Sequence, residues 1–497
     1  MKTKFTSMKN QLATPDNGSK TCEKPKLLCC RKPVLARLIQ LLCAATLMLP
    51  AFGTRAGVVF TNLYSFTGTN DGATPNGLVQ GSDGNFYGTT YAGGTNNLGT
   101  VFKISSSGAL TSLYSFAGAH DGANPQARLV QGSDGNLYGT TDSGGPYTNR
   151  FGIGYGTVFK ISTNGVLTNL YYFTGGTDGA KPQAGLVEGS NSIFYGTTYN
   201  GGTYNGGTVF KISTDGALTN LYSFAGNDGA YPSAGLVRGS DGYFYGTTQG
   251  GGTNGGGYGT VFKISTNGVL TSLHSFTGDD GLYPYAGLVQ GSDGYFYGTT
   301  IQTYIGGSYG FGTVFKISTN GALTSLYFFT GGNNGGNPYA ALVQGNDGSL
   351  YGTTTSSDTV FKISTNGVLT TLYSFTDGND GSIPYAGLVQ GTDGNFYGTT
   401  QGGGQGGAGT VLRLAIVPAA PVILATTITN GILTLTWSTE SGGIYQVQYK
   451  NQDSDLSSPN WNNLGGTLIA PGTTLSTSDL NIASEPLRRL YRVQRWQ

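Results

Sequence analysis

The tetrapeptide Tyr-Gly-Thr-Thr occurs seven times in this chain, and successive copies begin 46 to 57 residues apart. Two other segments keep the same spacing: Val-Phe-Lys-Ile, which becomes Val-Leu-Arg-Leu in the last copy, and a stretch similar to Leu-Tyr-Ser-Phe. The tetrapeptides begin at Tyr87, Tyr138, Tyr195, Tyr245, Tyr297, Tyr351 and Tyr397. A repeat of this length is one supersecondary unit that cannot bury its apolar face alone, so the chain must stack its copies into a solenoid or a propeller.

Each copy reads as four short β-strands. Runs rich in Val, Ile, Phe, Tyr and Thr are separated by Ser-Asp-Gly or Thr-Asn-Gly, which are typical of tight hairpins because Gly and Asn tolerate a positive φ. In the first copy the expected strands lie around 78–80, 86–90, 100–105 and 110–116. Four antiparallel strands per repeat are the build of a propeller blade, and no stretch of this region has helical periodicity.

The two ends of the array favour a closed ring. The last copy stops after its third strand, 409–415, whereas an orphan fourth strand, 58–66, precedes the first copy. If these two strands pair, no sheet edge is left open. We therefore predict an all-β fold, a seven-bladed propeller over 57–415 that its N-terminal strand closes. Second-strand glycines such as Gly88 and Gly139 should let neighbouring sheets approach near the axis.

Residues 1–56 have the order of a secretory signal peptide. They hold ten basic residues against two acids, with an apolar run at 38–49 and small residues before Ala56. We predict cleavage near Ala56 and an extracellular, outer-surface or periplasmic location. The four cysteines would leave with this segment, which excludes disulfides and thiolate chemistry from the mature protein. They are Cys22, Cys29, Cys30 and Cys43.

Charge and histidine content exclude further functions. Residues after 56 carry 16 basic and 23 acidic side chains, so nucleic acid is not an expected partner. His120 and His274 occupy unrelated positions of the repeat, so repeated elements cannot assemble a zinc site or a Ser-His-Asp triad. We expect a monomer without a cofactor, and no integral membrane segment once the signal is removed.

The repeats end after Ala415. Residues 416–421 contain two prolines and form a short stiff linker, and 422–497 alternate as short strands. This pattern predicts a small β-sandwich of the fibronectin type III or immunoglobulin kind, with Trp437 and Tyr491 in its core.

The unit S-D-G-N-F-Y-G-T-T, G-G-T, G-T-V-F-K-I resembles the repeat of the Gloeo/Verruco (GloVer) choice-of-anchor proteins, which are exported bacterial tandem-repeat proteins. The likeness covers about 360 residues, in which three spaced segments agree seven times. It implies export, a propeller-like array and, in many members, a C-terminal attachment signal, but no activity. This chain ends Leu-Tyr-Arg-Val-Gln-Arg-Trp-Gln, with no hydrophobic tail, so we expect neither a membrane nor a sortase anchor.

Variation among the copies indicates where a ligand would bind. The loops between the second and third strands range from 4 to 14 residues, and loops that vary on a rigid scaffold are where binding usually resides. Their tyrosines, among Gly, Asn and Thr, fit either long neutral loops or a surface for glycans. These tyrosines are Tyr91, Tyr147, Tyr155, Tyr199, Tyr204, Tyr258, Tyr304 and Tyr309.

The residue after each proline of the connections between blades should reach the mouth of the central channel, because it lies just ahead of the innermost strand. Amides occupy one side of this ring and aromatic side chains the other, whereas a purely structural position should be more uniform. We predict that a ligand contacts these residues: Asn76, Gln126, Gln183, Ser233, Tyr285, Tyr339 and Tyr385.

The same connections repeat Asp-Gly-x-x-Pro. An Asp before Gly most often forms an Asx turn, although carboxylates at equivalent places also suit calcium. The candidate calcium ligands are Asp71, Asp121, Asp178, Asp228, Asp280 and Asp380.

These features predict a secreted or cell-surface binding protein without enzymatic activity, whose propeller is a platform for a glycan or a protein. The alternative is a glycosidase or lyase that acts on polysaccharide. Such an enzyme needs paired carboxylates in different environments, and most acids of this chain recur in every copy. Only unrepeated acids would break this symmetry, and the candidates are Glu188 and Asp142.

Overall fold

The computed structural model describes residues 57–417 and parts of the C-terminal region, namely 421, 423–429, 432–439, 444–451, 461–470, 472, 474–479 and 489–496. The predicted signal peptide and residues 418–420 of the predicted linker lie outside these ranges. The chain divides into two compact units, Arg55–Ala419 and a second that contains Ala420–Gln497. We describe each unit by itself.

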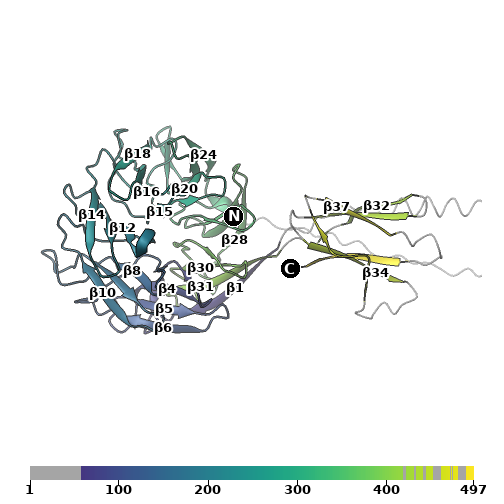
Figure 1. Ribbon diagram of the computed structural model, residues 1–497, viewed down its shortest axis with the longest axis horizontal. Coiled ribbons are helices and arrows are strands. Elements are labelled where there is room, and N and C mark those ends of the chain that lie inside the picture. The colour runs from purple at the N-terminus through teal and green to yellow at the C-terminus, as the bar shows by residue number, and fades with distance from the viewer. Residues whose placement is uncertain are drawn as a thin grey trace, which may run out of the picture. The chain divides into compact units, whose positions relative to one another are not determined.

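Residues 57–417 form seven antiparallel sheets, the blades, which follow one another around a ring (Figure 1). The innermost strands are β3 (Val79–Gln80), β7 (Val130–Gln131), β11 (Val187–Glu188), β15 (Val237–Arg238), β19 (Val289–Gln290), β25 (Val343–Gln344) and β29 (Val389–Gln390). The second strands are β4 (Phe86–Ala92), β8 (Leu137–Thr141), β12 (Phe194–Thr198), β16 (Phe244–Thr248), β20 (Phe296–Thr300), β26 (Leu350–Thr354) and β30 (Phe396–Thr400).

The third strands are β5 (Thr100–Ile104), β9 (Thr157–Ile161), β13 (Thr208–Ile212), β17 (Thr260–Ile264), β23 (Thr313–Ile317), β27 (Thr359–Ile363) and β31 (Thr410–Val417). The outermost strands are β6 (Leu110–Ser115), β10 (Leu167–Tyr172), β14 (Leu218–Ser223), β18 (Leu270–Ser275), β24 (Leu323–Phe328), β28 (Leu369–Ser374) and β1 (Gly57–Ser65). Smaller elements are β2 (Ala73–Pro75), the hairpin β21 (Thr303–Ile305) and β22 (Ser308–Gly310), and the 3-10 turns η1 (Ser190–Ser192) and η2 (Gly332–Asn334).

Strand β1 closes the ring. It pairs antiparallel with β31 along its length, with one shift in register between Asn62 and Tyr64, and the strand order of this sheet is β1-β31-β30-β29. The first and last strands of the unit therefore share one sheet. This arrangement confirms the predicted all-β propeller and its closure by the N-terminal strand.

The two threonines of the repeated tetrapeptide tie strands together. In every copy the first threonine donates its hydroxyl to a backbone carbonyl of the next blade, over 3.0 to 3.4 Å. Thr399 makes this bond across the ring closure, to the carbonyl of Asn76 at 3.0 Å. The second threonine stays within its blade, as Thr90 does with its Oγ1 2.9 Å from that of Thr100. These hydroxyls are buried, so each bond satisfies a carbonyl or hydroxyl that water cannot reach.

The glycine of the tetrapeptide makes room inside its own blade. Gly88 lies opposite Phe102, and a Cβ atom at Gly88 would stand 2.6 Å from the ring of Phe102 and 3.0 Å from a methyl group of Leu78. The predicted role of these glycines, close approach of neighbouring sheets, is therefore wrong, because the atoms that need the space belong to the same blade.

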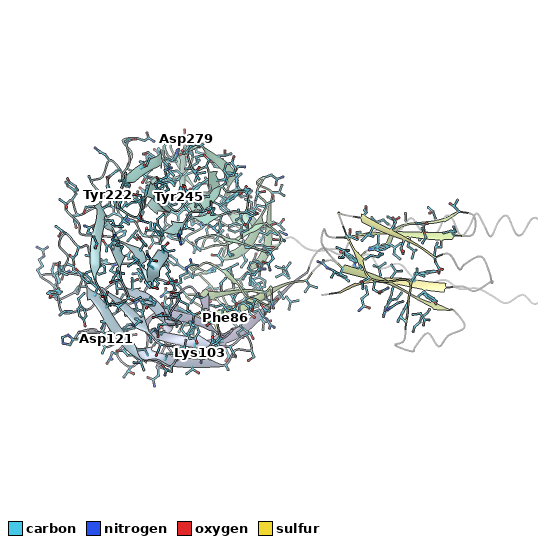
Figure 2. All side chains as sticks on the ribbon, in the orientation of Figure 1. Phe86, Lys103, Asp121, Tyr222, Tyr245 and Asp279 are labelled. Carbon is cyan, nitrogen blue, oxygen red and sulfur yellow. The ribbon has the colours of Figure 1, made fainter. Side chains whose placement is uncertain are left out.

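The apolar core lies between successive blades. Tyr138 of the second blade stacks on Phe194 of the third with ring centroids 4.1 Å apart, and both rings are fully buried. The hydroxyl of Tyr138 donates to Asp134 in the Ser-Asp-Gly turn at 2.8 Å. The tetrapeptide tyrosine thus buries its ring against the neighbouring blade and satisfies its polar end within its own. Figure 2 shows the equivalent Tyr245 closer to the centre of the ring than Tyr222 of an outermost strand.

The described part of the C-terminal unit contains two sheets around a shared core. One sheet comprises β32 (Ile423–Thr429), β33 (Ile432–Ser438) and β37 (Thr474–Asp479), and the other β34 (Ile444–Asn451), β35 (Asn462–Asn463), β36 (Leu468–Ile469) and β38 (Arg489–Trp496). Trp437 is fully buried in a core that also contains Leu435 and Val447, and Tyr491 packs against this core. A fibronectin type III relationship stays a prediction.

Candidate functional site

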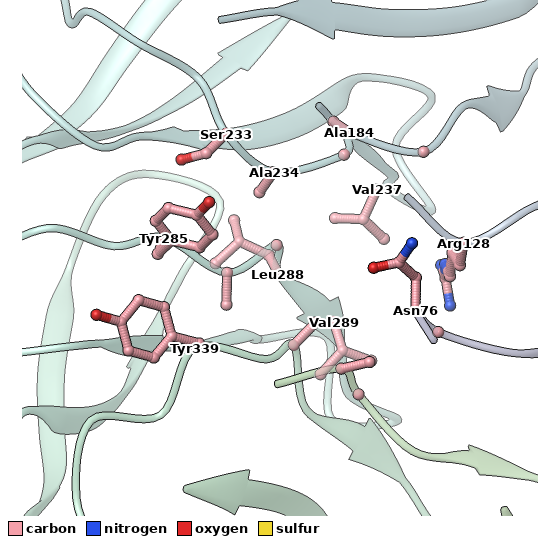
Figure 3. A pocket seen from close by; sticks show the side chains of 18 of the residues that line it. Asn76, Arg128, Ala184, Ser233, Ala234, Val237, Tyr285, Leu288, Val289 and Tyr339 are labelled. Atoms are coloured by element: carbon pink, nitrogen blue, oxygen red, sulfur yellow. The ribbon is translucent and has the colours of Figure 1, made fainter. Parts of the chain in front are cut away.

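A cavity of about 370 Å³ lies on the axis of the propeller, where the innermost segments of the seven blades meet. All seven residues predicted to contact a ligand line it or its mouth, although they come from seven different blades. Figure 3 shows Tyr285 and Tyr339 on one side of this cavity and Asn76 with Arg128 on the other. The predicted division into an aromatic side and an amide side is therefore present in the structure.

In every blade the residue two positions before the ring residue at the mouth has an unusual backbone conformation. The residue before each loop proline has a φ of 51° to 60°, a region that residues other than Gly and Asn enter at a cost of about 1–3 kcal/mol. A hydrogen bond to the preceding blade accompanies this conformation, as between the amide of Tyr283 and the carbonyl of Tyr258 at 2.8 Å. The seven residues are Thr74, Asn124, Lys181, Tyr231, Tyr283, Asn337 and Ile383. Because the strained residue is fixed in this way, the side chain after the proline is held at the axis.

Asn76 lies one position deeper than its place in the sequence suggests. The first blade has one residue fewer between its loop proline and its core leucine than the other blades have. Thr399 therefore donates to the carbonyl of Asn76, whereas in five other blades the equivalent threonine bonds to the alanine after the ring residue. The Asn76 amide donates to the carbonyl of Pro125 at 2.7 Å and to Thr89 Oγ1 at 3.1 Å, so its nitrogen is engaged in holding the second blade.

The three tyrosines of the mouth pack against one another. Tyr339 stacks on Tyr385 with centroids 4.9 Å apart, and Tyr285 meets both edge-on at 5.3 and 5.9 Å. Burial raises the pKa of Tyr285 and of Tyr385, and the electrostatic effect of the neighbouring Tyr285 raises that of Tyr385 further. The rings form a preassembled aromatic wall, not three separate stacking platforms.

One acid lies at the mouth. Asp142, at the end of β8, is buried, and its Oδ1 accepts a hydrogen bond from the amide of Gln183 at 3.0 Å. Burial raises the pKa of Asp142, although Gln183 and the charge of Lys181 oppose this. The charge of Asp142 also contributes to the raised pKa of Tyr285 across the mouth.

Glu188, the other unrepeated acid, has a structural role. It lies at the far end of its innermost strand, where its carboxylate accepts hydrogen bonds from the amide and the hydroxyl of Ser133 in the turn of the preceding blade. In other blades a glutamine makes the same contact, as Gln290 does with the amide of Ser240 at 2.9 Å. The two unrepeated acids are therefore not brought together.

Arg128 is the cavity residue that the sequence interpretation missed. It directly precedes the core leucine of the second blade, a position that holds Gly or Ala in the other six copies. The equivalent residues are Gly77, Gly185, Gly235, Gly287, Ala341 and Gly387. The signal was available in the sequence, because a large cation replaces a small residue in one copy only.

The six candidate calcium ligands each make contacts within one connection. The carboxylate of Asp71 accepts from the hydroxyl of Tyr64 at 3.0 Å and from the amide of Thr67 at 2.8 Å, and His274 replaces the tyrosine for Asp280. Figure 2 shows one of these acids, Asp121, at the periphery of the ring. Among the described residues no three His, Cys, Asp or Glu side chains are close enough to share a metal ion. The carboxylates therefore bond the local backbone, as the Asx-turn interpretation expected, but the donor amides precede the aspartate and do not lie two residues after it.

The tyrosines of the variable loops do not form one surface with the mouth. Tyr204 and Tyr309 are about two thirds exposed, and Tyr199 instead packs beside Tyr231 with centroids 5.3 Å apart. Neither Tyr204 nor Tyr309 lines the axial cavity.

The repeat identifies the family. A model of the Gloeobacter/Verrucomicrobia repeat matches the chain three times, over residues 53–257, 147–358 and 258–429. The chain belongs to the Gloeobacter/Verrucomicrobia repeat family. The resemblance that the repeated segments indicated is thereby confirmed. No curated protein matches this family member significantly.

Solved structures similar to this Gloeobacter/Verrucomicrobia repeat protein support the propeller. A streptogramin B lyase is 16% identical with a TM-score of 0.51, and the match covers 72% of this chain and 98% of that one. A catalytically inactive virginiamycin B lyase from Staphylococcus aureus, with quinupristin, is 18% identical with a TM-score of 0.51 over 72% and 100% of the two chains. At such identities the likeness concerns the fold alone. No helix within the described residues is long and apolar enough to cross a bilayer.

Proposed function

We propose that this protein is an exported, non-enzymatic binding protein whose propeller holds a glycan at the mouth of its axial cavity. The observation that carries the proposal is the mouth itself. Seven blades repeat nearly the same contacts everywhere else, and at this ring they place Tyr285, Tyr339 and Tyr385 opposite Gln126 and Gln183. Ligand sites in proteins are usually concave, and the mouth is the concave surface at which the seven blades differ in sequence.

The chemistry of the mouth suits a sugar. Aromatic walls pack against the apolar face of a pyranose ring, whereas amide groups donate to and accept from its hydroxyls. The cavity of about 370 Å³ is at the lower end of the range for small-ligand sites, which is about 300–1,000 Å³. A terminal sugar unit of a longer glycan would fit such a volume better than an internal segment of a chain.

A glycan array followed by calorimetry tests the proposal. Tyr339→Ala should weaken binding of an identified glycan about fivefold, the factor for roughly 1 kcal/mol of ring contact. Tyr309→Ala is the matched control, because that ring is 66% exposed and does not line the cavity. Equal effects of the two substitutions, or no effect of the first, would contradict a site at the mouth. Single substitutions are preferable to removal of all three rings, since these rings support one another.

Asp142 favours a second candidate, an enzyme that acts on polysaccharide. A buried carboxyl with a raised pKa at the mouth is the environment of a general acid. A glycosidase also needs a second carboxylate, and Glu188 is engaged by Ser133 outside the cavity. Reducing-end assays on every bound glycan, with Asp142→Asn as the variant, distinguish the candidates: turnover that this variant abolishes would replace the binding proposal.

Export and cleavage near Ala56 belong to the same proposal. The order of basic, apolar and small residues in 1–56 supports them. N-terminal sequencing of protein from the native host should find a new terminus close to Ala56, and an intact terminus on cytoplasmic material would contradict export.

A further inference from the structure

Arg128 departs most sharply from the sevenfold repeat. Five of its six equivalents are glycine and one is alanine, and all seven residues line the same axial cavity. The fold itself explains the small residues. A Cβ atom at Gly235 would stand 2.8 Å from the carbonyl oxygen of Gly185, and one at Gly185 would stand 2.9 Å from that of Arg128. Adjacent innermost segments therefore touch here through their backbones.

The first blade leaves space for the arginine. Its innermost segment is one residue shorter, and a Cβ atom at Gly77 would stand 3.2 Å from the Cβ of Arg128. The Arg128 side chain lies beside Asn76 on the side of the cavity that faces Tyr285 and Tyr339 (Figure 3). Arg128 therefore lines the cavity on the side opposite the aromatic wall (Figure 3).

The guanidinium of Arg128 has no protein partner among the described residues. The ion pairs in that part of the chain are His274 with Asp280 and Lys362 with Asp347, and no described side chain or carbonyl accepts a hydrogen bond from Arg128. The Arg128 side chain is exposed to solvent where it lines the cavity, and the protein around it lowers the pKa of the guanidinium by desolvation. A guanidinium at the wall of a cavity, with all of its donors free of partners among the described residues, is available to an anionic group that enters the cavity.

We propose that Arg128 binds an oxyanion carried by the sugar that enters the mouth, so that the ligand class is acidic saccharides. This inference rests on the proposed glycan site and adds that the glycan carries a negative charge. The planar fork of a guanidinium matches a carboxylate or a sulfate with two parallel hydrogen bonds. A uronate carboxylate and a sulfate ester share this chemistry, and the experiment separates them.

A general attraction for anions does not account for the site. Residues after 56 carry 23 acidic against 16 basic side chains, so the protein repels polyanions at long range. Besides Arg128, Asp142 and Lys181 are charged groups beside the mouth, and the ionised form of Asp142 opposes the approach of an anion. Only a short-range contact inside the cavity would therefore retain an acidic sugar, and the sugar must fit between the aromatic wall and Arg128.

The alternative is that Arg128 merely fills the space beside the shorter blade. That role predicts a stability loss when the side chain is removed, with equal effects on every ligand. The anion role predicts the reverse. Arg128→Gln should leave the melting temperature nearly unchanged, because the side chain is exposed and no described residue accepts a hydrogen bond from it.

Calorimetric titrations with three matched probes test the proposal: oligogalacturonate, a sulfated galactan oligosaccharide, and the neutral galactan oligosaccharide. The parent should bind at least one acidic probe about ten- to hundredfold more tightly than the neutral one, and Arg128→Gln should remove that preference, as expected for loss of a charge-assisted hydrogen bond. Asp142→Asn should strengthen acidic binding. Arg238→Gln is the control, because Arg238 is an exposed arginine at the outer end of β15 that donates to Ser190 outside the cavity.

Each outcome is decisive. Binding of the neutral probe as tight as that of both acidic probes keeps the glycan site and overturns the anion site, as does a loss in Arg128→Gln that is equal for all probes. If no oligosaccharide binds, the glycan site fails. Thermal stabilisation by inorganic sulfate then tests the anion site at Arg128 by itself. Stabilisation that Arg128→Gln abolishes would support the anion site, whereas no stabilisation of the parent protein would overturn the anion site.

Discussion

Gly246 and Gly398 occupy the same position of the tetrapeptide, but alanine should be tolerated at only one of them. A Cβ atom at Gly246 would stand 2.6 and 3.0 Å from ring atoms of Phe262 and 2.8 Å from a methyl group of Leu236. At Gly398 the residue opposite is Leu412, whose nearest atom would be 3.7 Å away, so that one methyl group of Leu388, at 2.7 Å, is the close neighbour. A methyl group at the end of a leucine can rotate aside, whereas a buried ring cannot move without its neighbours.

The structure gives a magnitude for this difference. Phe262 is fully buried and packs edge-on against Phe224 with centroids 5.2 Å apart, so Gly246→Ala overpacks a rigid site at a cost of about 1–3 kcal/mol. Alanine regains about 0.5–1 kcal/mol, because glycine loses more backbone entropy on folding. We expect Gly246→Ala to lower the free energy of unfolding by about 1–2 kcal/mol and Gly398→Ala to change it by less than about 0.5 kcal/mol.

Equilibrium unfolding in urea, followed by circular dichroism at a constant m value, measures both variants. The double variant Gly246→Ala with Phe262→Leu imitates the seventh blade, so the alanine should cost much less in that background. Equal losses at the two glycines, or a cost at Gly246 that the leucine does not reduce, would refute the assignment of these glycines to the cross-strand phenylalanine.

Three further predictions concern closure, titration and metal. A chain that starts at Gly68 lacks β1 and should melt well below the chain that starts at residue 57, because β31 loses its partner strand and Tyr373 loses the stacked ring of Phe60. Equal melting would contradict ring closure. Burial and a hydrogen bond to an aspartate raise the pKa of Tyr64 and of Tyr222 from 10.0 to about 12, so the stability that these pairs contribute is complete below pH 10 and is lost as pH rises through about 12. Tyrosinate absorbance should therefore rise together with unfolding. Titration of these rings near pH 10 in the folded state would be inconsistent with the tyrosine–aspartate pairs. A chelator should leave the melting temperature unchanged if the Asp-Gly acids bond only the local backbone, and a fall that calcium restores would instead favour the calcium interpretation for Asp71 and its equivalents.

The sequence by itself determined the architecture. The period of the tetrapeptide gives the blades, the alternation of short apolar runs and Gly-containing turns gives four strands in each, and the missing final strand indicates how the ring closes. These properties can be predicted because every blade repeats the same local contacts, so the same sequence pattern occurs seven times. The aromatic and amide sides of the mouth were also readable, since the residue after each loop proline differs between copies.

Only the tertiary structure decided what those residues do together. The first blade has one residue fewer after its loop proline, so Asn76 occupies the place that an alanine has in most other blades. This shift is visible only in the structure, where Thr399 of the last blade donates to the carbonyl of Asn76. Tyr339 and Tyr385 belong to successive blades and stack because the ring curves them toward one axis. Asp142 and Glu188 looked alike as unrepeated acids, yet one lies at the mouth and the other holds a distant turn. Local sequence fixes each blade, whereas the site depends on side-chain directions and distances between blades, which arise only when the ring is closed.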